Sequence, residues 1–192
     1  MRPDIIPGAI FPDYELSDHT AKRSKLSELQ GQHPMVLVLS RGGYCPRDRR
    51  QAEGLVQLHR ELEVAYCRLV TISTNNITET NEYRSGVGAH WPFLSDAGRI
   101  MQKDLDIAEY TDPVNNPMIP HVIVLEPGLV IYKIYNGYWF FGQEMPPGLG
   151  HHNARSQSGV AARSEGTLLS VRQNVRPNSW GAGLGKIWSL AV

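Results

Sequence analysis

The stretch MVLVLSRGGYCPRD, residues 35–48, decides the fold. Its first six residues are apolar on both faces, which is typical of a buried parallel strand in an α/β protein. From Pro46 the apolar residues recur at helical spacing, and this pattern predicts a helix that runs to about residue 63. The residues 67–74, CRLVTIST, predict a second apolar strand. The sequence therefore predicts a strand–helix–strand unit with a right-handed crossover.

One face of the predicted helix should pack on the sheet. The residues expected on that face are Ala52, Leu55, Val56, His59 and Leu62.

The flanking segments extend this unit in both directions. Residues 7–16 are interrupted by proline and glycine and suggest an extended edge segment, and residues 26–29, LSEL, suggest a short helical turn. Capping residues in NNIT favour a helix from 78 to 85, and an imperfect apolar stripe favours another within 97–107. Residues 121–137 predict a β-hairpin. The expected order is strand, helix, strand, helix, hairpin.

The end of the chain differs in composition from the rest. Residues 143–192 are dense in glycine, proline and serine, so we expect an irregular or mobile tail after a folded domain at residues 1–142. Aromatic side chains gather at residues 135–142 just before this tail. They fit hairpin packing or, alternatively, a homodimer contact, because aromatic residues are enriched at interfaces.

The composition excludes several classes of partner. The 192 residues carry 19 basic and 19 acidic side chains, so no charge excess suggests nucleic acid or an anionic membrane. No apolar run is long enough for a signal peptide or a membrane span, and we expect a cytoplasmic protein. No nucleotide-binding glycine motif and no metal-ligand spacing occurs, so we expect neither a cofactor nor a metal.

Cys45 stands where the predicted strand turns into the predicted helix. Proline is favoured at the first helical position, so Pro46 makes Cys45 the N-cap residue. Backbone N–H groups and the helix dipole then stabilise a thiolate, and nearby arginines add positive potential that Asp48 opposes. These arginines are Arg41, Arg47, Arg49 and Arg50.

The expected state of Cys45 is an exposed thiolate with a depressed pKa. Gly42 and Gly43 are expected to expose the sulfur. The alternative is an inert, buried cysteine that fills the turn.

The second cysteine, Cys67, is separated from Cys45 by the predicted helix. That helix would be about 27 Å long, whereas bridged cysteines need Cα atoms within about 7 Å. Asp48 occupies the place of the second thiol in a C-x-x-C motif. We therefore interpret Cys67 as a core residue rather than a resolving thiol and expect chemistry that uses one cysteine.

Four segments together resemble the AhpC/TSA branch of the peroxiredoxins, in the thioredoxin-fold superfamily. PGAIFPDYELSD (7–18) is similar to the N-terminal segment of that family, and LSEL (26–29) to its first short helix. RGGYCP (41–46) resembles the turn that carries the peroxidatic cysteine, and MIPHVIVLEPG (118–128) the proline-preceded strand. The resemblance covers roughly residues 5–142. It implies a thioredoxin-like α/β fold: a central mixed β-sheet flanked by helices, with an N-terminal extended segment.

The resemblance also implies an activity. A thiol-dependent peroxidase would reduce hydrogen peroxide or alkyl hydroperoxides through Cys45, which becomes a sulfenic acid and is regenerated by an external thiol such as thioredoxin or glutathione. Arg41 or Arg49 would stabilise the thiolate and polarise the peroxide. Gly43, Tyr44 and Pro120 would position the substrate.

The same resemblance implies a local geometry around the proline-preceded strand. Pro120 would follow a cis peptide bond after Ile119 and pack against Cys45, and His121 would lie nearby.

Three departures from the family pattern leave other functions open. Val38 and Gly42 stand where proline and a peroxide-positioning threonine are usual, and NNPM (115–118) stands where a second arginine is usual. One alternative is a monothiol disulfide oxidoreductase. Another is a thioredoxin-like module for redox sensing or interaction that has lost turnover.

Overall fold

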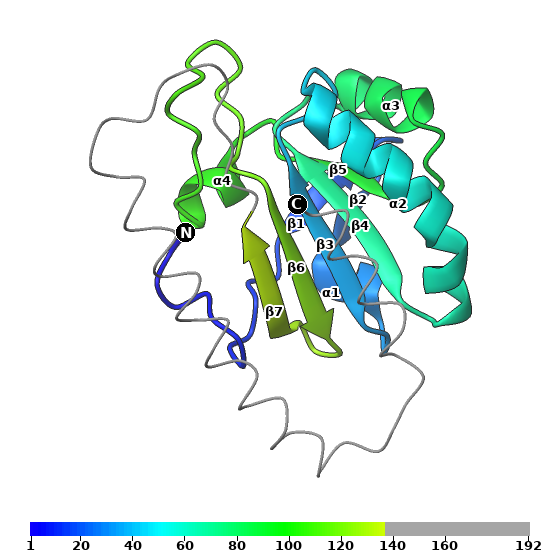
Figure 1. Cartoon of the computed structure of the whole chain (residues 1–192). Helices are drawn as coiled ribbons and strands as arrows, with labels where there is room; N and C mark the ends of the chain where they lie inside the picture. The colour runs from blue at the N-terminus through cyan, green and yellow to red at the C-terminus, as the bar shows by residue number, and fades with distance from the viewer. Residues whose placement is uncertain (137–192) are drawn as a thin grey trace, which may run out of the picture. The chain divides into compact units, whose positions relative to one another are not determined.

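The computed structural model describes residues 1–136, which form an α/β unit around one seven-stranded mixed sheet (Figure 1). The strand order is β2-β1-β5-β4-β3-β6-β7. The strands are β1 (Glu15–Asp18), β2 (Arg23–Lys25), β3 (Met35–Ser40), β4 (Arg68–Ser73), β5 (Phe93–Ser95), β6 (His121–Glu126) and β7 (Val130–Asn136). The helices are α1 (Leu26–Gln30), α2 (Pro46–Val64), α3 (Ile77–Gly86) and α4 (Ile100–Asp104).

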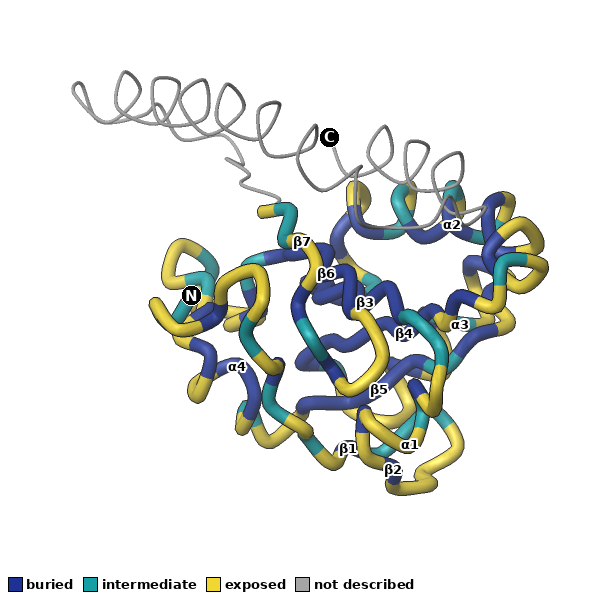
Figure 2. The backbone as a smooth tube through the Cα atoms, turned by 90° about the horizontal axis from the view of Figure 1, so that it is seen from below, coloured by how far each residue is buried: buried dark blue, intermediate teal, exposed yellow. Residues whose placement is uncertain are grey.

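The central strand β3 is buried along its whole length, as Figure 2 shows. It pairs in parallel with β4 and antiparallel with β6, so its backbone has hydrogen-bonded strands on both sides. Its alternate residues Met35, Leu37 and Leu39 join the main core cluster with Leu26 of α1 and Met101 of α4. The prediction of a strand that is buried on both faces, in a mixed sheet, is therefore confirmed.

The opposite face of the sheet carries α2 and α3. Ser40 at the end of β3 faces Asp48 in α2 and Tyr83 in α3, and Tyr83 packs edge-on against Phe93 of β5. The helix α2 begins and ends within one residue of the prediction. Its buried face contains Leu58 where the sequence pattern placed Val56, which is only half-buried.

The shorter elements differ most from the sequence-based expectations. The helix α4 has five residues instead of spanning the apolar stripe, and the three-residue strands β2 and β5 were not predicted. The start of α4 depends on Asp96, whose carboxylate accepts the backbone N–H groups of Ile100, Met101 and Gln102. Such a cap satisfies the first N–H groups of a helix, which have no partner within it.

The expected hairpin is present as β6 and β7. The expected irregular tail, residues 143–192, lies outside the described residues, as does most of the aromatic segment 135–142. No helix in residues 1–136 is long and apolar enough to cross a membrane.

A single glutamine holds α1 against the hairpin. Gln30 is 1% exposed, its Nε2 donates to the carbonyl of Glu126 at 2.8 Å, and its Oε1 accepts the backbone N–H of Leu129 at 2.9 Å. Two backbone groups of the β6–β7 turn thus depend on one side chain.

We expect Gln30→Ala to lower the free energy of unfolding by about 2 kcal/mol or more, because both backbone groups lose a buried partner. Urea unfolding should show a lower midpoint at unchanged slope. Gln32→Ala, at an exposed position two residues on, is the control and should leave the midpoint unchanged. Equal midpoints for the two variants would contradict the bridging role.

Candidate functional site

Cys45 is the N-cap residue of α2, with Pro46 in the first turn, as the sequence predicted. Its backbone is extended, with φ −80° and ψ 117°, and its side chain makes no capping hydrogen bond of ordinary geometry. The backbone N–H groups of Arg47 and Asp48 nevertheless lie close enough to the sulfur to lower its pKa. The sulfur thus lies at the positive end of a 19-residue helix.

Two predictions about Cys45 are wrong. The residue is 2% exposed rather than accessible, and its pKa is raised rather than depressed. Burial is the largest cause, because it disfavours the charged thiolate, and the Asp48 carboxylate is the second. The N–H groups at the start of the helix and the Arg41 guanidinium oppose this shift without reversing it.

Gly42 and Gly43 let the side chains of Asn75 and Tyr83 pack closely against the turn, and they do not expose the sulfur. A Cβ on Gly42 would lie 2.1 Å from Asn75 Oδ1, and Gly42 has φ +117°, a conformation that side-chain-bearing residues rarely adopt. A Cβ on Gly43 would lie 2.9 Å from Tyr83 Cβ. A threonine at position 42 would therefore meet both a steric and a backbone obstacle.

The predicted arginines have different surroundings. Arg41 is 7% exposed and forms an ion pair with Glu109, Nη2 to Oε2 3.1 Å, and its charge lowers the pKa of Cys45. Arg49 lies toward α3, with Nη2 3.5 Å from the place that a Cβ on Gly86 would take. Arg49 lowers the pKa of Tyr83, although burial raises that pKa overall.

Asp48 is the residue whose importance the sequence did not reveal. It is 5% exposed, and its Oδ2 accepts hydrogen bonds from Ser40 Oγ at 3.1 Å and from the backbone N–H of Arg41 at 2.5 Å. The Cys45 thiol lies close enough to this carboxylate to lower its pKa, although burial raises that pKa overall. Tyr83 Oη donates to the Asp48 carbonyl at 2.9 Å, so α3 is tied to the first turn of α2.

The remaining predicted positions, Tyr44 and Pro120, differ in burial. Tyr44 is 44% exposed, and its hydroxyl donates to Asp112 Oδ2 at 3.1 Å. Pro120 is buried just before β6, and the pairing of Leu39 with His121 places it beside the carboxyl end of β3. The implied cis bond after Ile119 is wrong, because residues 1–136 contain no cis peptide bond.

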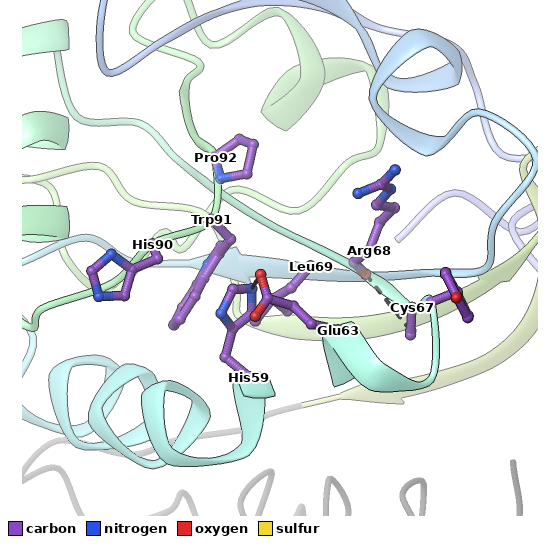
Figure 3. A pocket seen from close by; sticks show the side chains of 9 residues that line it. His59, Glu63, Cys67, Arg68, Leu69, His90, Trp91 and Pro92 are labelled. Carbon is purple, nitrogen blue, oxygen red and sulfur yellow. Dashed lines mark hydrogen bonds and ion pairs between the residues drawn. The ribbon is translucent and has the colours of Figure 1, made fainter. Parts of the chain in front are cut away.

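Cys67 lies at the other end of α2, beside a separate pocket of about 280 Å³ (Figure 3). It follows the helix, is buried, and its thiol donates to the carbonyl of Arg68 at 3.7 Å. Burial raises its pKa to about 11, so it is a weak nucleophile near neutral pH. The pocket walls include His59, Glu63, His90 and Trp91, but no three metal-binding side chains in the described chain are placed to hold an ion.

The fold and the site define a thioredoxin-fold protein whose thiol caps a helix at the carboxyl end of a central strand. The model of the AhpC/TSA family matches residues 7–134, two thirds of the chain. The chain therefore belongs to the AhpC/TSA family.

Solved structures support the fold. The chain is 20% identical to the peroxidoxin BcpB from Mycobacterium tuberculosis, with TM-score 0.61 over 68% of this chain and 84% of that one. It is 18% identical to reduced Prx3 from Vibrio vulnificus in complex with hydrogen peroxide, with TM-score 0.63 over 74% and 89%. A thiol peroxidase from Chromobacterium violaceum, 18% identical, gives TM-score 0.57 over 68% and 76%. No curated protein matches the chain by sequence.

We expect Gly42→Ala to destabilise the protein by about 1–3 kcal/mol, because its Cβ would collide with Asn75 and its φ is strained for alanine. Thermal unfolding followed by circular dichroism would measure this loss. Gly86→Ala is the control, since its Cβ would meet only the flexible end of Arg49 at 3.5 Å. An unchanged midpoint for Gly42→Ala would contradict the described turn.

His121 should make stability depend on pH. Burial lowers its pKa from 6.5 to about 4, despite the hydrogen bond between Nδ1 and the Ile119 carbonyl. Between these values the unfolded chain binds more protons than the folded one, so the free energy of unfolding should fall as the pH falls through this window. The loss amounts to about 3 kcal/mol at most.

The variant His121→Leu isolates this contribution from those of the other histidines. Urea unfolding at several pH values should give a flatter dependence for the variant than for the wild type between pH 6.5 and about 4. Parallel curves would show that the unfolded and folded states bind equal numbers of protons at this site.

Proposed function

We propose that this protein is a one-cysteine thiol peroxidase. Cys45 attacks the O–O bond of hydrogen peroxide or an alkyl hydroperoxide and becomes a sulfenic acid, and water or an alcohol leaves. The observation that carries the proposal is the position of the Cys45 sulfur at the N-terminus of α2, where the positive charge of Arg41 lowers the pKa of the thiol. A thiolate there meets N–H groups and a guanidinium that stabilise negative charge.

Arg41 is the better candidate of the two arginines for holding the peroxide. Its charge acts on Cys45, and the ion pair with Glu109 fixes the guanidinium beside the site. Gly43, Tyr44 and Pro120 remain candidates for positioning the substrate. Tyr44 supports this role best, because it is the partly exposed neighbour of the buried thiol.

The cycle uses one cysteine of the chain and an external thiol. The helix α2 separates the two cysteines by about 28 Å, from its 19 residues at about 1.5 Å each. Cys67 is therefore unsuited to resolve a sulfenic acid at Cys45 while the helix is intact. Thioredoxin or glutathione would regenerate the Cys45 thiol. We also propose a homodimer and a cytoplasmic location, which the composition allows.

A redox-sensing module without rapid turnover is the second candidate. The raised pKa of Cys45 favours it, because a neutral thiol reacts slowly with peroxide. A disulfide oxidoreductase is less well supported, since a thiol that is 2% exposed offers little access to a protein disulfide.

Peroxide consumption by single-cysteine variants tests the proposal. In the presence of dithiothreitol, Cys45→Ser should lose peroxide consumption and Cys67→Ser, the matched control, should retain it. A Cys45→Ser protein that consumes peroxide as fast as the wild type would refute the proposed function. Consumption that depends on Cys45 but stops after one equivalent under dithiothreitol would favour the sensing module.

A further inference from the structure

The carboxylate of Asp48 is placed to exchange a proton with the Cys45 thiol. It is buried, and it is fixed on one side by Ser40 Oγ at 3.1 Å and by the backbone N–H of Arg41 at 2.5 Å. Cys45, the N-cap residue, lies three residues before Asp48 at the same buried helix start, and its thiol is close enough to lower the pKa of the carboxylate. A buried base that two donors fix next to the reacting group is the arrangement that general acid–base catalysis uses.

The surroundings let one negative charge be shared between the two groups. Burial raises the pKa of both Cys45 and Asp48, because it disfavours the charged form of each group, and the Asp48 carboxylate raises the pKa of Cys45 further. Arg41 provides the compensating positive charge for both groups and is itself paired with Glu109. The other ionisable groups that face the pair are Tyr83 of α3 and Tyr44, whose pKa values are both raised, so both stay neutral.

We propose that Asp48 is a second catalytic residue of this site, which takes the proton of the Cys45 thiol and returns it to the oxygen that leaves the peroxide. The inference rests on the proposed peroxidase function. It assigns a role to the carboxylate that occupies the second thiol position of a C-x-x-C motif.

The reaction balances with the groups present. The thiol proton passes to the Asp48 carboxylate, and the sulfur electron pair attacks the terminal peroxide oxygen, which forms the S–O bond and breaks the O–O bond. The sulfur is oxidised to a sulfenic acid and the peroxide is reduced. The departing alkoxide or hydroxide takes the proton from Asp48, which becomes a carboxylate again.

A simple electrostatic role makes the opposite prediction. As a fixed negative charge, Asp48 only raises the pKa of Cys45, so Asp48→Asn would produce more thiolate and a faster reaction near neutral pH. If Asp48 is an acid–base group, Asp48→Asn removes the proton acceptor and slows the reaction. The two roles are therefore separated by the sign of one rate change.

The experiment compares the wild type, Asp48→Asn and Asp48→Glu with two peroxides. Cumene hydroperoxide releases an alkoxide that needs a proton, whereas peracetic acid releases a carboxylate that does not. We expect Asp48→Asn to react about a hundredfold more slowly with the hydroperoxide near neutral pH and to lose much less rate with the peracid. Asp48→Glu should recover part of the hydroperoxide rate.

The pH profile gives an independent readout. With the hydroperoxide, the rate of the wild type should be nearly constant between the pKa of Asp48 and that of Cys45, and that of Asp48→Asn should rise about tenfold per pH unit up to the thiol pKa. A faster Asp48→Asn protein, or equal losses with both peroxides, would overturn the inference. If Asp48→Asn fails to fold by circular dichroism, the solvent deuterium isotope effect in the wild type decides the question. Proton return to the leaving oxygen predicts a larger effect with the hydroperoxide than with the peracid, and equal effects would overturn the inference.

Failure of the inference differs from failure of the proposed function. A wild-type protein that reacts with neither peroxide refutes the peroxidase function, and the inference fails with it. A wild-type protein that consumes both peroxides through Cys45, with Asp48→Asn equally fast, refutes only the role of Asp48.

Discussion

The hydrogen bonds of the buried Asp48 carboxylate hold the start of α2 against the end of β3. This one side chain satisfies Ser40 in the last position of the strand and the backbone of Arg41 in the turn. The backbone carbonyl of Asp48 also accepts a hydrogen bond from the Tyr83 hydroxyl of α3. The strand, the turn and two helices therefore meet at one residue, and the position of Cys45 follows from that junction.

The same junction determines which groups raise and which lower the pKa of Cys45. Burial and a neighbouring carboxylate work against a thiolate at Cys45, whereas the helix N-terminus and Arg41 work for it. The opposing causes do not cancel, and burial dominates. A group that can accept the thiol proton locally removes the need to expose the thiolate to water, which is the physical reason to consider Asp48 as more than a structural cap.

The sequence predicts the parts of the fold that depend on periodicity and local chemistry. The all-apolar run of β3, the helical spacing after Pro46 and the proline-marked N-cap at Cys45 are properties of neighbouring residues, and the structure confirms them. The burial of Cys45 depends on side chains far along the chain, such as Tyr83, which packs against the diglycine turn. Strands of three residues, such as β5, exist only through pairing with their neighbours and leave no periodic signal.

The conformation of Gly42 links two distant positions of the chain. Its positive φ brings the backbone against Asn75, whose Oδ1 is buried and has no hydrogen-bond partner among the described residues. A threonine at position 42 would be accommodated only if the turn changed its path and Asn75 were replaced by a smaller residue. Whether a β-carbon fits at position 42 thus depends on two positions together, Gly42 and Asn75, although 33 residues separate them in the chain.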